Sequence, residues 1–443
     1  MILMLSLFLF AFSYFIFLYI FSADDWALFP SNRHVYKNGK VLYAGDITDC
    51  EGVVLCHTQD GERVYNDDEY IRLATLHAVG DLEGYIATGV HTAMRDDVTG
   101  YDKFNGLYNV SGTGNNVELT IDSRLCVKAY QQLEGYCGTI AMYNYRTGEL
   151  VCMASSPSFD VSDNFIASDE DEGVYMNRFL SSTFTPGSTF KVVTACAAVG
   201  TLDDAYEREY VCNGGTTIKG EWVACTGNHG TITLEDAFAY SCNSYFSQLT
   251  VDLGKDTLTE YAEKLGFNGE FALDGVKVAT SSYNVDDAKT IDFAWSGIGQ
   301  YKDLFNPLQY LTAIGAIANS GTAVKPYIIS SIKNDLGFEL YNAKIEETEM
   351  LDKYTADSVA ELMDNTVEIY YTKERFGNLD VCAKTGTAEI GEDDIPHSVL
   401  VGFVDDTDMP FAFVAIVENG GSGNGIALNS VSNLLQYAAE IYK

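Results

Sequence analysis

Residues Phe184–Val193 read FTPGSTFKVV. A rigid Pro-Gly turn leads to Ser188, and Lys191 follows at the start of an apolar run that continues to Gly200. Residues three apart lie on neighbouring parts of one helical face, about 5–6 Å apart at their Cβ atoms. A helix that is apolar all round is buried, and a buried ammonium is costly unless it is paired or deprotonated. The stretch therefore predicts a hydroxyl beside a buried amine at the start of a core helix that Gly200 ends.

This pair has the chemistry of an activated nucleophile. Desolvation lowers the pKa of a lysine, and the neutral amine can take the serine's proton so that the oxygen attacks a carbonyl. Unsatisfied backbone N–H groups at a helix start stabilise the negative charge that develops. Alone, S-x-x-K is a weak signal, because a Ser N-cap with a snorkelling Lys has the same spacing.

Two further motifs raise the specificity. Ser241-Cys242-Asn243 follows a short helix predicted over Leu234–Ala239. Lys384-Thr385-Gly386-Thr387 lies within a predicted strand, where Thr385 and Thr387 share one face and Lys384 and Gly386 the other. A glycine inside a strand is tolerable where a ligand backbone must approach closely. Such a strand offers backbone pairing, hydroxyls and a cation to an extended acyl peptide.

The periodicity predicts one sheet around a helical insertion. A hairpin with an Arg-Thr-Gly turn comes early, three strands come late, and a closing helix covers about 426–442. We therefore expect an α/β (α+β) domain over 116–443, with a central antiparallel sheet flanked by helices. The predicted strands are 138–156 for the hairpin, then 379–390, 397–406 and 411–420.

The N-terminus predicts a membrane anchor. The first 21 residues, MILMLSLFLFAFSYFIFLYIF, carry no charge and span about 30 Å as a helix, the thickness of the bilayer core. A poor cleavage site follows, so residues 1–22 are interpreted as an uncleaved transmembrane helix. No Lys or Arg precedes it, and the positive-inside rule does not orient it. Residues 23–115 read as a small membrane-proximal domain.

Charge and cysteines constrain the remaining possibilities. The net charge of −36 argues against nucleic acid and against a polybasic membrane patch. Ten scattered cysteines do not make a disulfide scaffold. Cys212 and Cys225 flank a Gly-rich loop that a disulfide could close. A metal site adding His229 lacks a clear fourth ligand, and Cys242 is interpreted as a small buried hydrophobe.

S-x-x-K, S-x-N and K-T-G in this order form the motif set of penicillin-binding proteins and class A β-lactamases. With further stretches in the family's order, the chain resembles a class B penicillin-binding protein of the short-stemmed kind over nearly its whole length. These stretches are AGDITDCEGVVL (44–55), ATLHAVGDLEGYIATGVHTAM (74–94), GNNVELTIDSRL (114–125), NHGTITLEDAFAYSCNSYF (228–246), GIGQ (297–300), NPLQ (306–309) and AIANSGTAVKP (316–326).

The resemblance implies a penicillin-binding transpeptidase/serine β-lactamase-like fold and a role for each motif residue. Ser188 would be the acylated nucleophile and Lys191 its base. Ser241 would relay the proton to the leaving amine, and Asn243 would hold Lys191 and the substrate amide. In the third motif, around Gly386, Lys384 would supply positive potential, while Thr385 and Thr387 would bind the substrate's terminal carboxylate. The oxyanion hole would be the backbone N–H groups of Ser188 and Thr387.

The implied reaction is D,D-transpeptidation. The enzyme would cleave the terminal D-Ala-D-Ala bond of a peptidoglycan stem peptide, pass the acyl group to a neighbouring strand's amine, and be inhibited by β-lactams. No metal or organic cofactor is implied. The implied setting is the bacterial cell membrane, single-pass, with the catalytic domain outside and a SEDS-type glycosyltransferase as partner.

Rival functions share part of this pattern. A class A β-lactamase or a D,D-carboxypeptidase has the same acylation chemistry, but no E-x-x-L-N-type loop lies between Asn243 and Lys384. A membrane-bound β-lactam sensor or silent scaffold is opposed by the single predicted span and the intact motifs. The chain departs from the family at Ala44, Cys50–Glu51, Tyr301 and Val399–Leu400, which concerns stem partners and substrate fit rather than the chemistry.

Overall fold

The computed structural model describes most of the chain, and four stretches of the expected 23–115 domain, 28–35, 38–39, 42–43 and 102–113, lie outside the described residues. By their internal contacts, the residues form two compact units. The predicted domain boundaries at 22 and 115 stay predictions. The described residues are 2–27, 36–37, 40–41, 44–101, 114–163, 167–168, 172–391 and 394–443. The first unit takes 1–119, 160–165 and 329–343, and the second takes 120–159, 166–328 and 344–443.

The first unit contains the N-terminal helix and a mixed sheet. Helix α1 (Ile2–Ala27) has the length and apolar composition to cross a membrane over Ile2–Ser22. The sheet order is β17-β16-β6-β3-β4-β5, so two strands from beyond residue 328 join this sheet, and β16 pairs with β6. The elements are β1 (Tyr36–Lys37), β2 (Lys40–Val41), β3 (Ile47–Thr48), β4 (Val54–Gln59), β5 (Glu62–Tyr65), β6 (Asn116–Leu119), β16 (Ile329–Lys333), β17 (Glu339–Asn342), α2 (Glu69–Val79), α3 (Val90–Ala93) and α4 (Arg95–Thr99).

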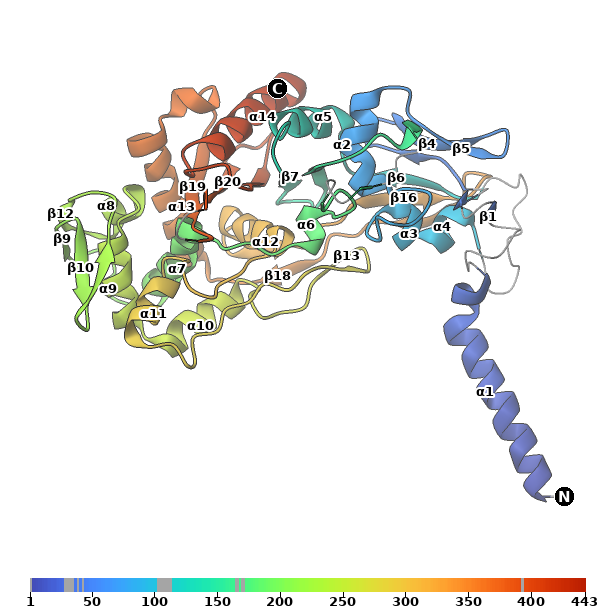
Figure 1. The fold of residues 1–443 in the computed structure, drawn as a ribbon, viewed down its shortest axis with the longest axis horizontal. Helices are drawn as coiled ribbons and strands as arrows, with labels where there is room; N and C mark the ends of the chain where they lie inside the picture. Colours follow the sequence, from blue (N-terminus) through green and yellow to red (C-terminus); the bar gives the residue numbers. More distant parts are fainter. Residues whose placement is uncertain are drawn as a thin grey trace. The chain divides into compact units, whose positions relative to one another are not determined.

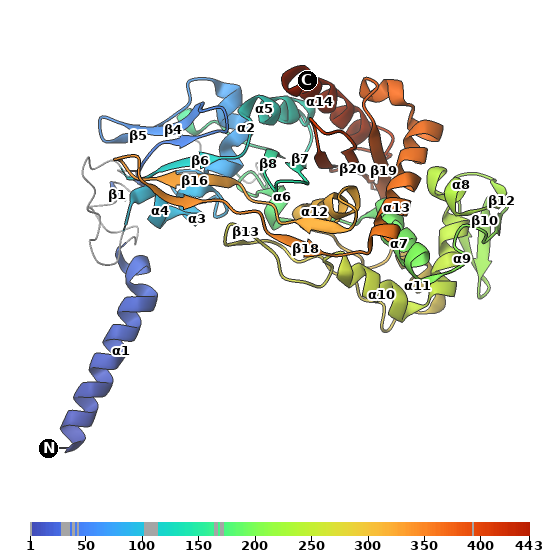
Figure 2. The ribbon, with the colours of Figure 1, turned by 180° about the vertical axis from the view of Figure 1, so that it is seen from behind.

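The second unit is built on an antiparallel sheet in the order β19-β20-β21-β7-β8. Strand β21 (Phe411–Val417) pairs with β7 (Gly138–Asn144), which confirms that the early hairpin and the late strands form one sheet. Helices α5 and α14 pack on one side of these strands and α12 on the other (Figures 1 and 2). The remaining strands and these helices are β8 (Leu150–Ser156), β19 (Val381–Ala388), β20 (His397–Val404), α5 (Ser123–Gln132), α12 (Pro307–Ala318) and α14 (Ile426–Tyr442).

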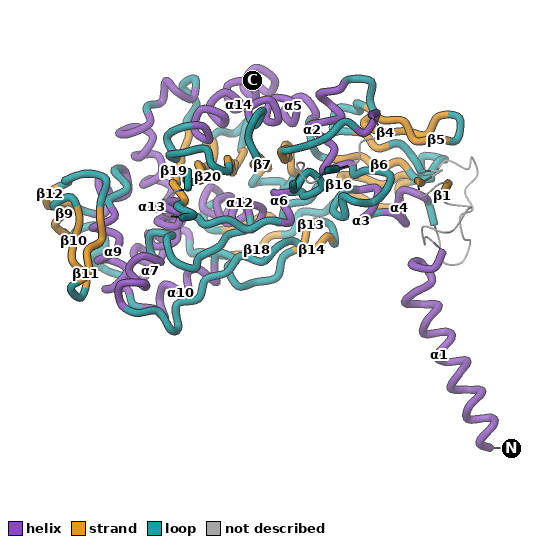
Figure 3. Tube along the Cα trace, viewed as in Figure 1, coloured by secondary structure: helices purple, strands orange, loops and turns teal. Residues whose placement is uncertain are grey.

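The middle of the second unit is mostly helix and loop. The segment between α10 (Lys255–Lys264) and α12 holds only short elements joined by long loops (Figure 3). This part of the chain also contains small two-stranded sheets, β9 with β12 and β10 with β11. The further elements are β9 (Tyr210–Cys212), β10 (Gly215–Ile218), β11 (Glu221–Ala224), β12 (Gly230–Ile232), β13 (Ala272–Leu273), β14 (Val276–Lys277), β15 (Thr322–Val324), β18 (Glu347–Glu349), α8 (Leu234–Ala239), α9 (Asn243–Leu253), α11 (Thr290–Ser296) and α13 (Lys353–Thr366).

The stretch with Ser188, the predicted nucleophile, begins as a 3₁₀ turn, η2 (Gly187–Phe190), and continues as the buried helix α7 (Lys191–Thr201). Ser188 therefore precedes the α-helix by one tight turn. The predicted stop at Gly200 is wrong by one residue, because α7 includes it. A side chain at Gly200 would collide with the Tyr261 hydroxyl, so the glycine permits close packing against α10.

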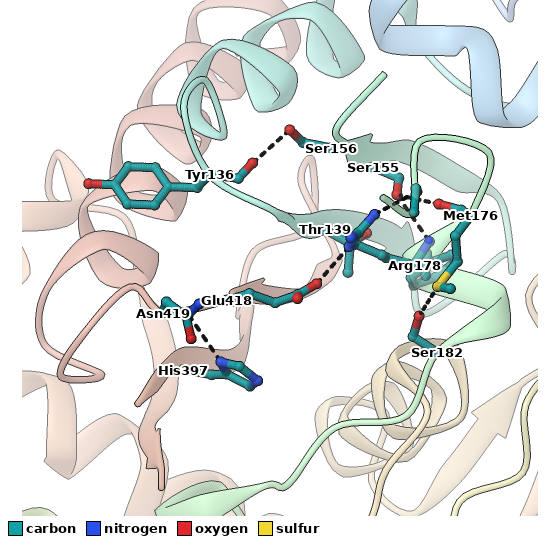
Figure 4. A network of polar contacts seen from close by, with 12 residues as sticks. Tyr136, Thr139, Ser155, Ser156, Met176, Arg178, Ser182, His397, Glu418 and Asn419 are labelled. Carbon is teal, nitrogen blue, oxygen red and sulfur yellow. Dashed lines mark hydrogen bonds and ion pairs between the residues drawn. The ribbon is translucent and has the colours of Figure 1, made fainter. Parts of the chain in front are cut away.

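A polar network holds the segment that leads to Ser188. In helix α6 (Arg178–Ser181), the Arg178 guanidinium donates to Glu418 Oε1 at 2.6 Å, and its backbone N–H donates to Ser155 Oγ at 3.0 Å (Figure 4). Ser155 lies on β8, and Glu418 directly follows β21. In the same view, the Asn419 backbone N–H donates to His397 Nδ1 at 3.0 Å. Arg178, nine residues before η2 begins, therefore fixes the point from which the chain runs to this turn.

Candidate active site

The amine of Lys191 is the centre of the site. Its Nζ lies 3.0 Å from Ser188 Oγ, 2.9 Å from Ser241 Oγ and 2.8 Å from Asn243 Oδ1, and 2.7 Å from the Ser241 carbonyl oxygen. These partners come from η2, from the turn after α8, and from the first residue of α9. The structure thus brings the first two predicted motifs into direct contact.

Burial decides the protonation of this amine. Lys191 is completely buried, and desolvation lowers its pKa to about 7, although the sulfurs of Cys225 and Cys242 oppose the shift. The Ser241 carbonyl and Asn243 Oδ1 can only accept, so they take two N–H bonds of a neutral amine. The lone pair is then left for a hydroxyl proton, from Ser188 or Ser241. This is the arrangement of a general base.

The second motif is held in an unusual backbone conformation. Ser241 has φ of 55°, in the left-handed region that non-glycine residues rarely adopt. The turn is kept by backbone bonds from Ser241 to Phe238 and from Cys242 to Ala237, at 3.1 and 2.8 Å. Both the side chain and the carbonyl of Ser241 therefore point at Lys191. The strain is consistent with a functional constraint.

The third motif lies along the same pocket. Besides Ser188, Ser241 and Asn243, the pocket is lined by Lys384, Thr385 and Thr387 of β19. Lys384 is almost fully buried, and burial, followed by the charge of Lys191, holds its pKa well below the usual range. Six of the eight predicted residues therefore line one pocket, and Lys191 contacts three of these six.

Gly386, the remaining predicted residue, packs closely against other parts of the chain. A side chain there would press on the Pro186 carbonyl and on the side chain of Thr189, both beside the nucleophile. A side chain at Gly423 would in turn press on the backbone of Gly386. A glycine at position 386 therefore lets the turn at Pro186–Thr189 approach strand β19 closely. It sets the spacing between η2 and β19.

Sequence reasoning missed three residues that surround the third motif. The Tyr371 hydroxyl bonds Thr385, Asn424 Oδ1 accepts from Thr385 Oγ1 at 3.1 Å, and Gln300 Nε2 donates to the Thr387 carbonyl at 2.9 Å. Tyr371 ends a π-helical turn, η3 (Val367–Tyr371), after α13. A signal existed for Asn424, because it stands in the Gly-rich stretch 420–425 after the last strand. The local sequence around Tyr371 carries no such signal.

Comparison with known proteins agrees with this geometry. Residues 138–436 match the penicillin binding protein transpeptidase domain. The chain belongs to the penicillin-binding protein transpeptidase family. This confirms the resemblance seen in the motifs.

Relatives and solved structures resemble this transpeptidase domain over most of the chain. The peptidoglycan D,D-transpeptidase PbpA of Mycolicibacterium smegmatis is 28% identical, covering 91% of this chain and 89% of the relative. MrdA of Escherichia coli, also a peptidoglycan D,D-transpeptidase, is 22% identical, covering 88% of this chain and 70% of the relative. The D,D-transpeptidase domain from Eggerthella lenta superposes with a TM-score of 0.78 at 26% identity, covering 90% and 98%. The ceftriaxone acyl-enzyme complex of Mycobacterium tuberculosis penicillin-binding protein A shares the fold, with a TM-score of 0.78 at 24% identity. The match covers 89% of this chain and 98% of that structure.

Proposed function

We propose that the chain is a peptidoglycan D,D-transpeptidase that works through a Ser188 acyl-enzyme and is inhibited by β-lactams. The observation that carries the proposal is the contact of a buried Lys191 amine, with a pKa of about 7, with Ser188 Oγ at 3.0 Å. The family membership and the names of the relatives support the reaction class. The site residues and their roles are part of the proposal.

Acylation begins with proton transfer to Lys191. The Ser188 oxygen attacks the carbonyl of the penultimate D-Ala while Lys191 Nζ takes its proton. Ser241 Oγ, 2.9 Å from the same amine, passes that proton to the nitrogen of the leaving D-Ala. The backbone N–H groups of Ser188 and Thr387 stabilise the oxyanion. In the second half, an amine from a neighbouring strand attacks the ester, and the proton returns by the same route.

The third motif binds the terminal carboxylate. In its protonated form Lys384 gives the pocket positive potential, and the hydroxyls of Thr385 and Thr387 are donors for the carboxylate of a stem peptide or a β-lactam. Asn243 orients the substrate amide and Lys191 together.

The N-terminal helix and the place of the substrate together give the proposed location and orientation of the enzyme. Residues 1–22 hold the enzyme in the bacterial cell membrane by a single span, with the catalytic residues on the outer side, where the stem peptides are. Glycan polymerisation belongs to a partner of the SEDS glycosyltransferase type. This partnership rests on the resemblance alone.

The test is the fate of a penicillin on the full-length chain in detergent. Intact mass is followed for hours after addition of benzylpenicillin, with Ser188→Ala in parallel and Ser430→Ala, a buried serine of α14, as the matched control. A lasting adduct of one drug per chain, absent only from Ser188→Ala, is expected. Rapid loss of the adduct with drug consumption would indicate a β-lactamase, and a folded protein without any adduct would indicate a scaffold.

A further inference from the structure

Three cysteines and a histidine converge next to the second motif. Cys212 ends β9, Cys225 follows β11, His229 precedes β12, and Cys242 caps the N-terminus of α9. His229 Nδ1 lies 3.4 Å from Cys212 Sγ and 3.6 Å from Cys225 Sγ, and Cys225 Sγ lies 3.9 Å from Cys242 Sγ. All four of these atoms are within 4.8 Å of one another.

We propose that these four residues form a structural zinc site, with Cys212, Cys225 and Cys242 as thiolate ligands and His229 binding through Nδ1. Zn–S bonds of about 2.3 Å and Zn–N bonds of about 2.0–2.1 Å place tetrahedral ligand atoms about 3.5–3.8 Å apart. The observed separations of 3.4, 3.6 and 3.9 Å correspond to these edges. Three sulfurs and one imidazole select zinc over magnesium or calcium. Four protein ligands leave no open position, so the site is structural.

One ligand sulfur accepts a backbone hydrogen bond, and two of the ligand cysteines are buried. The Tyr245 backbone N–H donates to Cys242 Sγ at 3.4 Å. Both Cys212 and Cys242 are completely buried. Partners of this kind orient ligands and hold their charge in known metal sites.

The local fold also needs such an anchor. Strands β9 to β12 have three or four residues each and form two-stranded sheets. They lie beside α8 and α9 (Figures 1 and 2). Their apolar cluster is small, with Ile218 and Val223 packed on Ile291 and Ala294. Isolated two-stranded sheets are marginally stable, and small folds often add a metal.

The site is directly connected to the catalytic residues. Cys242 stands between Ser241 and Asn243, which both contact Lys191. The Asn243 amide donates to the carbonyl of Ala224, the residue before Cys225, at 3.2 Å. A metal bound to Cys225 and Cys242 therefore fixes both ends of the contact that orients Asn243.

The sequence pattern C-x₁₂-C-x₃-H lacked a fourth ligand, and Cys242 is that ligand, 13 residues beyond His229. The competing arrangement is a disulfide between two of the thiols. It needs sulfurs about 2.0 Å apart and leaves the third thiol and the imidazole without a shared partner. In the structure the three cysteines are free thiols.

The test is the metal content of the full-length chain, purified in detergent under reducing conditions without chelator. Elemental analysis is expected to find about one zinc per chain, and Cys225→Ser and His229→Ala to retain less than about a tenth of it. Cys196→Ser, at a buried thiol of α7 outside the cluster, is the matched control and keeps the metal. Replacement of zinc by cobalt is expected to produce thiolate-to-cobalt charge-transfer bands.

A ligand swap separates metal loss from misfolding. His229→Cys keeps a four-ligand set and is expected to retain zinc that His229→Ala loses. Ser188→Ala also retains it, so the result does not depend on the transpeptidase activity. Two outcomes would overturn the proposal: a reduced, folded chain that takes up no zinc when it is supplied, or a disulfide among these cysteines that persists in the chain isolated from the cell membrane.

Discussion

The Tyr371 hydroxyl lies 2.7 Å from Thr385 Oγ1 and accepts a bond from the Thr385 backbone N–H at 3.0 Å. Because Thr385 Oγ1 donates its own proton to Asn424 Oδ1, the Tyr371 hydroxyl must donate to Thr385 Oγ1. The Thr385 hydroxyl is thus held by partners on both sides. Before the Thr385 hydroxyl can donate to a substrate carboxylate, it must give up its bond to Asn424. The bond from Tyr371 then still holds the Thr385 oxygen in position.

Tyr371→Phe is therefore expected to slow benzylpenicillin acylation about tenfold, the effect of losing one or two buried hydrogen bonds. The affinity for drugs that carry a carboxylate falls with it. Tyr206→Phe is the matched control, because its hydroxyl makes only a 3.5 Å contact with the Ser358 carbonyl, away from the pocket. Stopped-flow acylation rates measure both. Equal rates for Tyr371→Phe and the wild type would remove Tyr371 as a positioning residue.

Acylation should depend on the protonation of Lys191. Its pKa is lowered to about 7 by burial, and only the neutral amine accepts the Ser188 proton. The rate of acylation is therefore expected to be low at acidic pH and to rise through about pH 7 to a plateau. Rates measured across this range with a chromogenic cephalosporin test this. A rate that is flat with pH, while the protein stays folded, contradicts Lys191 as the base.

Gly386→Ala is expected to separate β19 from η2. The added methyl group meets the Pro186 carbonyl and the Thr189 side chain, and such overpacking costs about 1–3 kcal/mol. We expect a lower melting temperature together with slower acylation. Gly269→Ala is the control, since the nearest atom to an added Cβ is 3.4 Å away. A Gly386→Ala enzyme with wild-type stability and rate would disprove this packing role.

The Arg178–Glu418 pair should contribute to stability more than exposed pairs do. Glu418→Gln leaves the guanidinium of Arg178, only 8% exposed, without its charged partner at a cost of about 1–3 kcal/mol. Glu270→Gln breaks the pair with Lys277, in which both side chains are more than 70% exposed, and is expected to change nothing measurable. Thermal unfolding compares them. Equal melting temperatures for the two variants would refute the difference.

The N-terminal helix should keep the chain in the membrane. Residues 2–22 are apolar and exposed, as a lipid-facing span requires. The full chain is expected to stay with membranes after carbonate extraction, and a variant without residues 2–22 to be released. Protease added to spheroplasts should cut the catalytic domain. An intact domain under these conditions would reverse the proposed orientation.

Local features of the chain were predictable from the sequence alone. The helices at 234–239 and 426–442 and the strand that contains Lys384 were found where periodicity and turn residues placed them. The three motifs were recognisable because each is a short segment whose residue types have a direct chemical meaning. The family was predicted from their order for the same reason.

Residues close together in the chain define the sheet's strands, the three motifs and the apolar anchor, so these features were predictable from the sequence. Tertiary packing sets which distant segments meet. It pairs β16 with β6 across about 200 residues, turns Tyr371 towards Thr385, and adds Cys242 to Cys212, Cys225 and His229. It also lowers the pKa of Lys191, because desolvation is a property of everything packed around a side chain rather than of its neighbours in sequence.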